Sequence, residues 1–187
     1  MKLRTTLVVL SLFTLISAFS GGYLYHAFLK KSMLNAAERR ISLDALSIED
    51  CISSFISGNV KTVKALAGLN ELREALEIPD EPNLAQANSV LDHFRDSLDV
   101  GVCYLIDVHG NTIASSNRRE PNSFIGKNYA FRPYFQQALQ GIPGLFMGLG
   151  VTSKERGIYY SHPIYGKSPD SVIGCAVVKA TVDIFEK

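Results

Sequence analysis

Two basic side chains interrupt segments that otherwise have the composition of protein core, and both have the chemistry to bind an anion. Arg132 precedes Pro133 at the start of a short predicted helix, where a planar guanidinium can hold one carboxylate through two parallel hydrogen bonds. Lys179 lies in the apolar stretch Gly174–Ala180 and, because alternate strand residues share a face, lies on the face of Val177. A lysine there is either a solvated edge residue or a cation directed into a pocket.

Four hydroxyl-bearing side chains could donate to the same anion. Thr152 and Ser153 follow Gly150 at the end of a predicted strand, where the alternative interpretation is an ordinary turn. Tyr129 and Tyr160 could donate phenol hydrogen bonds and wall a pocket, or simply pack in the core. The sequence therefore indicates one candidate anion site built from an arginine, a lysine and hydroxyl groups.

The sequence carries no recognisable pattern for catalysis or metal binding. Asp107, His109 and Ser115 could be written as a catalytic triad, but a hairpin does not place them in that way. The chain contains no nucleophile elbow, no phosphate-binding glycine loop and no phospho-acceptor histidine box. The three cysteines form no C-x-x-C pair, and the four histidines form no ligand cluster. We therefore expect no catalytic site and no cofactor within this chain.

The overall composition is that of a globular protein, with 47% hydrophobic and 20% charged residues among 187. The net charge is +1, so the chain lacks the basic field that gathers nucleic acid.

One segment is far more apolar than the rest. Residues 5–29 contain no Asp, Glu, Lys or Arg, and a helix of this length crosses a bilayer core of about 30 Å. A cleaved signal peptide is the alternative, with Ala18–Ser20 as its cleavage site, but apolar residues continue to Phe28. We expect a transmembrane signal anchor at residues 1–30. Basic residues lie on both sides of the span, so charge alone leaves its orientation open.

A helical stripe follows this anchor. No proline interrupts residues 31–78, and apolar residues recur along the stretch at steps of three and four until Pro79 and Pro82. We predict a long stalk helix over residues 31–78, continuous with the anchor and pairing with a second copy in a homodimer. Two shorter helices joined at Gly58 are the alternative.

Residues 79–187 predict a module of mixed helix and sheet. A second amphipathic helix comes first, and a shorter helix over residues 131–139 follows the second strand. The expected strands cover residues 102–106, 112–115, 145–151, 157–164 and 172–180. Helices followed by an antiparallel sheet of about five strands give an α+β fold class.

Four segments of this module resemble a known family. Tyr104–Asn111 resembles the hairpin of Cache domains, the extracytoplasmic PAS-like sensors. Asn128–Phe135, Gly150–Tyr160 and Gly174–Lys179 resemble, in this order, the membrane-distal module of the double Cache sensors of four-carbon dicarboxylate sensor histidine kinases. The likeness extends over the whole chain, but the second Cache module, the second membrane helix and the kinase core of that family are missing from it.

The resemblance implies a PAS-like sheet on a long helix, a periplasmic sensor domain anchored in the inner membrane, and a small organic dicarboxylate as ligand. It favours the pocket interpretation for Arg132 and Lys179, and it places Ser153 at a family position. The chain is then the extracytoplasmic ligand-sensing input region of a membrane signal-transduction protein, in the first instance a two-component sensor histidine kinase. The alternatives are the input region of a diguanylate cyclase or chemoreceptor, and a stand-alone membrane-anchored binding or adaptor protein.

Overall fold

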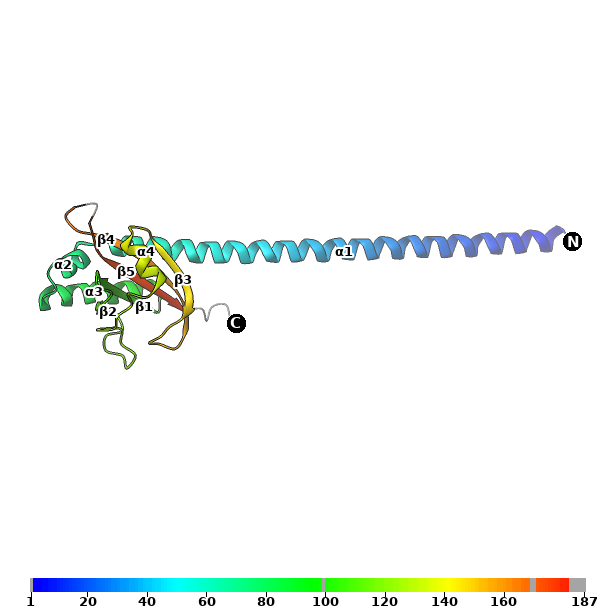
Figure 1. Cartoon of the computed structure of the whole chain (residues 1–187). Helices are drawn as coiled ribbons and strands as arrows, with labels where there is room; N and C mark the ends of the chain where they lie inside the picture. Colours follow the sequence, from blue (N-terminus) through cyan, green and yellow to red (C-terminus); the bar gives the residue numbers. More distant parts are fainter. Residues whose placement is uncertain (1, 99, 169–170, 182–187) are drawn as a thin grey trace. The chain divides into compact units, whose positions relative to one another are not determined.

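The computed structural model describes residues 2–98, 100–168 and 171–181, in which it contains four helices and five strands (Figure 1). The chain forms two compact units, residues 1–53 and 54–187. Helix α1, Lys2–Ala67, supplies the first unit, where apolar side chains such as Phe13 are exposed. Among the described residues, α1 is the one helix long and apolar enough to cross a membrane.

Helix α1 ends earlier than the predicted stalk helix. It continues without a break through Gly58, so the alternative of two helices joined there is wrong, but it stops at Ala67. The Gly68 N–H closes the last turn on two carbonyl oxygens, each at 3.2 Å, and Leu69 is extended. Helix α2, Asn70–Glu77, then begins. The apolar stripe crosses this break because both helices bury residues in the same core.

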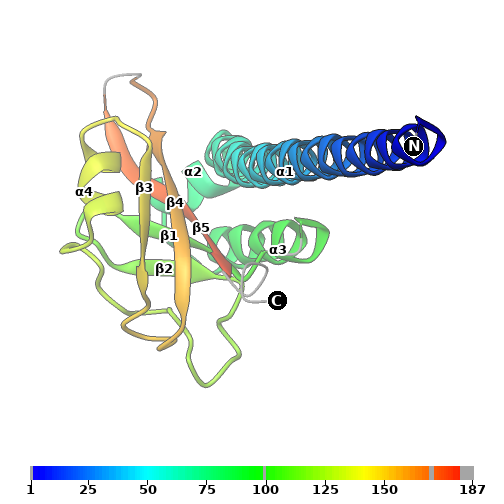
Figure 2. The same ribbon diagram turned by 90° about the vertical axis from the view of Figure 1, so that its right-hand side faces the viewer.

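The other two helices lie near their predicted positions. Helix α3, Glu81–Leu98, begins after Asp80, whose carboxylate accepts the Asn83 N–H at 3.0 Å, and Pro82 fits into its first turn. Helix α4, Pro133–Leu139, is the short helix expected after the second strand. Figure 2 shows α3 and α4 on opposite sides of the sheet.

The five strands form one antiparallel sheet in the order β2-β1-β5-β4-β3, which confirms the predicted α+β fold class. Their bounds are β1 Val102–Asp107, β2 Thr112–Ser115, β3 Gly144–Leu149, β4 Arg156–Tyr165 and β5 Val172–Thr181. The β1–β2 turn contains Gly110 at φ +86°, where any side chain would collide with Ala130. Strand β5 is the middle strand of the sheet.

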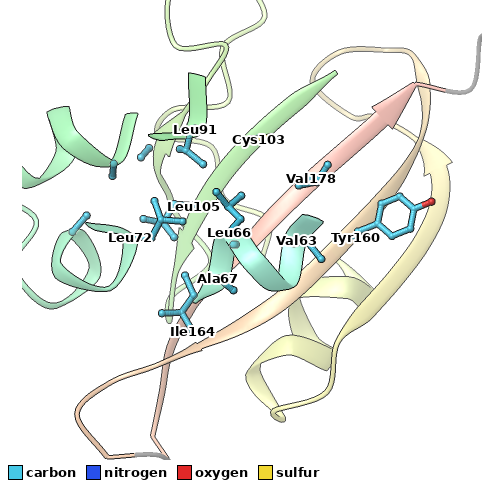
Figure 3. Close-up of a cluster of buried hydrophobic side chains, with 14 of the residues drawn as sticks. Val63, Leu66, Ala67, Leu72, Leu91, Cys103, Leu105, Tyr160, Ile164 and Val178 are labelled. Atoms are coloured by element: carbon cyan, nitrogen blue, oxygen red, sulfur yellow. The ribbon is translucent and has the colours of Figure 1, made fainter. Parts of the chain in front are cut away.

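The two faces of the sheet pack in different ways. On the face of α3, strand residues such as Leu105 and Val178 pack with Leu66, Leu72 and Leu91 from the helices (Figure 3). The face of α4 is aromatic and carries Tyr104, Phe124, Tyr129, Tyr134 and Tyr159. Along β5, alternate side chains enter these two cores, as the period of two predicts.

Candidate functional site

Lys179 is a buried cation in the middle of the sheet. Its side chain is 1% exposed, and its Nζ donates to Ser153 Oγ at 2.9 Å and to Glu155 Oε2 at 3.0 Å. Because β5 is the middle strand, the solvated-edge interpretation does not hold. The register pairs Lys179 with Tyr159 of β4. Gly157 makes room for the lysine stem, since a Cβ there would lie 2.9 Å from Lys179 Cε.

Arg132 is a second buried cation, held by aromatic rings. It is 7% exposed, and its Nη2 donates to the Leu149 carbonyl oxygen at 3.1 Å. Its Cζ lies 5.3, 5.5 and 5.8 Å from the ring centroids of Phe131, Phe146 and Tyr159. Within the residues that the structure describes, Nε has no hydrogen-bond partner and the guanidinium has no ion pair. Arg132 therefore has unused donor capacity beside a full positive charge.

Tyr129 and Thr152 form a hydroxyl pair close to the arginine. The Tyr129 and Thr152 hydroxyl oxygens lie 2.7 Å apart, so the loop after β3 is tied to the segment before α4. Burial raises the pKa of Tyr129, while the hydrogen bond to Thr152 and the charge of Arg132 act in the lowering direction. The phenol is therefore neutral near pH 7 and can donate a hydrogen bond.

The structure does not bring Tyr160 to this group, which corrects the sequence prediction. Tyr160 belongs to the core on the opposite face of the sheet, where Figure 3 shows it near the end of α1. Tyr159 takes its place and stacks on Tyr134, with ring centroids 5.4 Å apart and planes at 3°. Burial raises the pKa of Tyr159, against the effect of Arg132. The alternation of side chains along a strand puts Tyr159 and Tyr160 on opposite faces. It therefore indicated that only one of them could line the site, without showing which.

One loop carries the remaining polar groups. The β3–β4 loop, residues 150–155, is closed by the Gly150 N–H, which donates to the Glu155 carbonyl oxygen at 2.8 Å. It positions Thr152 beside Tyr129, and both Ser153 and Glu155 beside the lysine. Sequence reasoning missed Glu155, because a glutamate in a polar turn carries no pattern that separates it from a solvated surface residue.

The residues that a catalytic triad would need do not assemble. Asp107 Oδ1 accepts the backbone N–H groups of His109 at 2.9 Å and Asn111 at 2.8 Å, as a turn-forming aspartate does. Ser115 Oγ donates to Asn117 Oδ1 at 2.6 Å. These contacts stabilise the hairpin and the loop that follows it.

The candidate site thus brings together Arg132, Lys179, Tyr129, Thr152 and Ser153 on the aromatic face of the sheet. It contains two buried cations, neutral hydroxyl groups and one chain carboxylate, that of Glu155. The positive charges exceed the negative ones, and the donors outnumber the acceptors. This balance suits a small anion that carries carboxylates.

No family model matches the chain. A C4-dicarboxylate transport sensor protein, DctB of Pseudomonas aeruginosa, is 39% identical over 123 residues, which are 65% of this chain and 20% of that protein. DctB of Rhizobium meliloti is 38% identical over 112 residues, or 60% of this chain and 18% of that protein. The chain therefore spans about a fifth of the length of these relatives.

Solved structures show the same fold. The crystal structure of the V. cholerae histidine kinase DctB sensor domain matches with a TM-score of 0.73 and 32% identity, covering 83% of this chain and 58% of that one. The ligand-binding domain of the Campylobacter jejuni chemoreceptor Tlp3 matches with a TM-score of 0.58 at 22% identity, covering 71% and 54%. In sequence and in fold, this chain is similar to the sensor domain of the C4-dicarboxylate sensors named DctB.

Proposed function

We propose that this chain is the extracytoplasmic ligand-sensing input region of a two-component sensor histidine kinase and that it binds a small organic dicarboxylate. The observation that carries the proposal is Arg132, a buried guanidinium without an acidic partner among the described residues, on the same sheet face as buried Lys179. An unpaired charge is costly to bury, and a bound anion would offset that cost.

Each cation has a role that matches its geometry. Arg132 binds one carboxylate through its planar fork, and the surrounding rings of Phe146 and Tyr159 hold the fork in place. Lys179 binds the second carboxylate as a point charge. Ser153, beside Lys179, and Tyr129, beside Thr152, donate hydrogen bonds from their hydroxyl groups to the ligand. The similar proteins named as C4-dicarboxylate sensors support this ligand class.

The apolar beginning of α1 supports a membrane location. Residues 1–30 anchor the chain in the inner membrane, and residues 79–187 form the sensor module on the periplasmic side. The helical segment between them, with α2 at its end, connects the two and pairs with a second copy. Ligand binding then shifts the helices by its differential affinity for two states of the module, typically about 1–3 kcal/mol.

Calorimetry on the full chain in lipid nanodiscs tests the ligand class. Succinate, fumarate and malate are titrated beside succinamide and putrescine, which have four carbons but no carboxylate. We expect binding of at least one dicarboxylate and of neither control. Binding confined to the neutral or the cationic compound would refute the proposal.

A separate observation tests the output. The reading frame that follows Lys187 is expected to encode a second apolar span and then a kinase with its phospho-acceptor histidine. A diguanylate cyclase or a methyl-accepting signalling domain in that place would assign the same sensor to a different output, and a stop codon would favour a stand-alone binding or adaptor protein.

A further inference from the structure

The buried ammonium of Lys179 already has a carboxylate partner within the chain. Glu155 Oε2 lies 3.0 Å from Nζ, and Ser153 Oγ accepts a second Nζ–H at 2.9 Å. An ammonium has three donors, so Glu155 and Ser153 leave only one of them free. A ligand carboxylate that is to pair with Lys179 thus meets a position that another carboxylate holds.

The two partners differ sharply in their freedom to leave. The side chain of Lys179 is 1% exposed and enclosed by the sheet, whereas that of Glu155 is 62% exposed. A carboxylate that stays largely hydrated is released at low cost, since it loses little solvation in the pair and regains it outside. The buried ammonium, in contrast, has little solvent to replace a lost partner and is strongly stabilised by a counter-charge. Another anion can therefore replace the Glu155 carboxylate while the Lys179 ammonium stays in place.

The loop allows this exchange without large movement. Thr152 is tied to Tyr129, and the Gly150 N–H holds the Glu155 backbone carbonyl, so the two ends of the loop stay in position. Rotation of the Glu155 side chain into solvent is enough to vacate the ammonium. Ser153 then remains as a donor or acceptor for the incoming group.

We propose that Glu155 is an internal competitor for the ligand: its carboxylate occupies Lys179 in the free protein, and a ligand carboxylate displaces it. This inference rests on the proposed function, because it concerns the same site. It makes Glu155 a specificity-determining residue. Arg132 has no internal carboxylate partner among the described residues, so the first carboxylate of a ligand binds there without competition, while the second must outcompete Glu155.

Competition of this kind has a defined effect on affinity. The apparent dissociation constant is the intrinsic one divided by the fraction of molecules in which the ammonium is vacant. If Glu155 is paired in about 90% of molecules, its removal tightens binding about tenfold. A monocarboxylate that uses Arg132 alone should gain much less than a dicarboxylate.

The test compares Glu155→Gln with the wild type and with Glu120→Gln, all as full chains in nanodiscs. Glu120 is a matched control, since it pairs with Arg95 at 2.7 Å on another part of the module and its side chain is 38% exposed. Succinate and butyrate, two four-carbon acids that differ in one carboxylate, are titrated into each protein. Succinate should bind Glu155→Gln about tenfold more tightly than wild type, with butyrate and Glu120→Gln little changed.

Three results would overturn the inference. Equal or weaker succinate binding by Glu155→Gln, with binding by wild type intact, refutes the competition and leaves the proposed function standing. An equal gain for butyrate shows that Glu155 acts as a general repulsive charge and not as an occupant of the second carboxylate position. Failure of both proteins to bind any dicarboxylate refutes the proposed function and the competition together.

Discussion

Arg132 and Lys179 are the residues whose substitution should separate binding from folding. Arg132→Ala removes charge-assisted hydrogen bonds in a largely dry site, at a cost of about 2–4 kcal/mol, or roughly 30- to 1000-fold in affinity. Arg132→Lys should lose most of this affinity too, because an ammonium has no planar fork. Lys179→Met, which keeps the length of the stem, should lose as much while its melting temperature holds or rises.

Calorimetry with the best dicarboxylate and thermal melts without ligand measure both effects. Unchanged affinity in Arg132→Ala and Lys179→Met, with folding intact, would place the ligand on a different part of the molecule.

Cys103 lies in the core on the α3 face of the sheet, and its burial makes the stability of the fold depend on pH. Burial raises the pKa of Cys103 from 9.0 to about 12, so the thiol stays neutral in the folded chain at a pH where the unfolded chain ionises it. Its contribution to stability is complete below about pH 9 and is lost as the pH rises through the window from 9 to 12. At pH 10 the loss is about 1.4 kcal/mol.

Denaturant unfolding at pH 8, 9 and 10 measures this loss. Cys103→Ala should start from a lower stability, because it leaves a small cavity, but should fall less steeply with pH. An identical pH slope in the variant and the wild type would show that the thiol does not contribute.

At the scale of the elements, Gly157 determines whether strand β4 can accept the lysine stem. A Cβ at Gly157 would lie 2.9 Å from Lys179 Cε and 3.1 Å from the Ala180 carbonyl oxygen. Gly157→Ala should therefore destabilise the fold by about 1–3 kcal/mol and weaken dicarboxylate binding, because the stem must move. Gly58→Ala is the control: nothing lies within 4 Å of its Cβ, and it should add up to about 1 kcal/mol of helix stability.

Chemical unfolding and calorimetry on the two alanine variants check this pair of effects. Ligand affinity that is equally unchanged in both would mean that the lysine stem adapts without cost to the site.

Prediction from sequence worked where the pattern and the local chemistry agree. Alternation in β5 assigned Lys179 to the correct face, and the glycine-containing turn at Gly110 identified the first hairpin. It failed where one pattern serves two structures. The apolar stripe continues past Ala67 because α1 and α2 share a core, so periodicity could not show the break. Tyr159 and Tyr160 both suit a strand, and only the register assigns each to its face.

The site itself could be predicted only in part, for a reason of chemistry. A charge within an otherwise apolar segment is rare enough to be a signal. It made Arg132 and Lys179 candidates, and the family resemblance then favoured a pocket role for both. A hydroxyl group or an exposed carboxylate has no such contrast with its surroundings. Ser153 therefore rested on the family resemblance, and Glu155 became visible only when the fold placed it beside Lys179.

At the scale of the whole molecule, exposed apolar residues on α1 predict association. Ile41, Ile48 and Ile52 are 69%, 60% and 39% exposed, in a part of the helix that follows the anchor. We expect a parallel homodimer through this segment when the anchor is present. With Cys51 replaced by serine, single cysteines at Ile48 and Ile52 should form disulfide-linked dimers in membranes, whereas a cysteine at Glu49 should do so much less. Equal cross-linking at all three positions would contradict a defined interface.

The two faces of β5 bear on how the module can change in evolution. Lys179 lies between Val178 and Ala180, and these neighbours belong to the core that contains Val63 and Leu66 of α1. Lys179 of the proposed anion site and the residues that share a core with α1 are thus consecutive in one strand. Under the proposed function, a response to ligand needs to cross only the thickness of the sheet, without a relay of side chains along it. At the proposed site, position 179 can therefore change with the ligand while Val178 and Ala180 preserve the core shared with α1, so ligand preference and response can evolve separately.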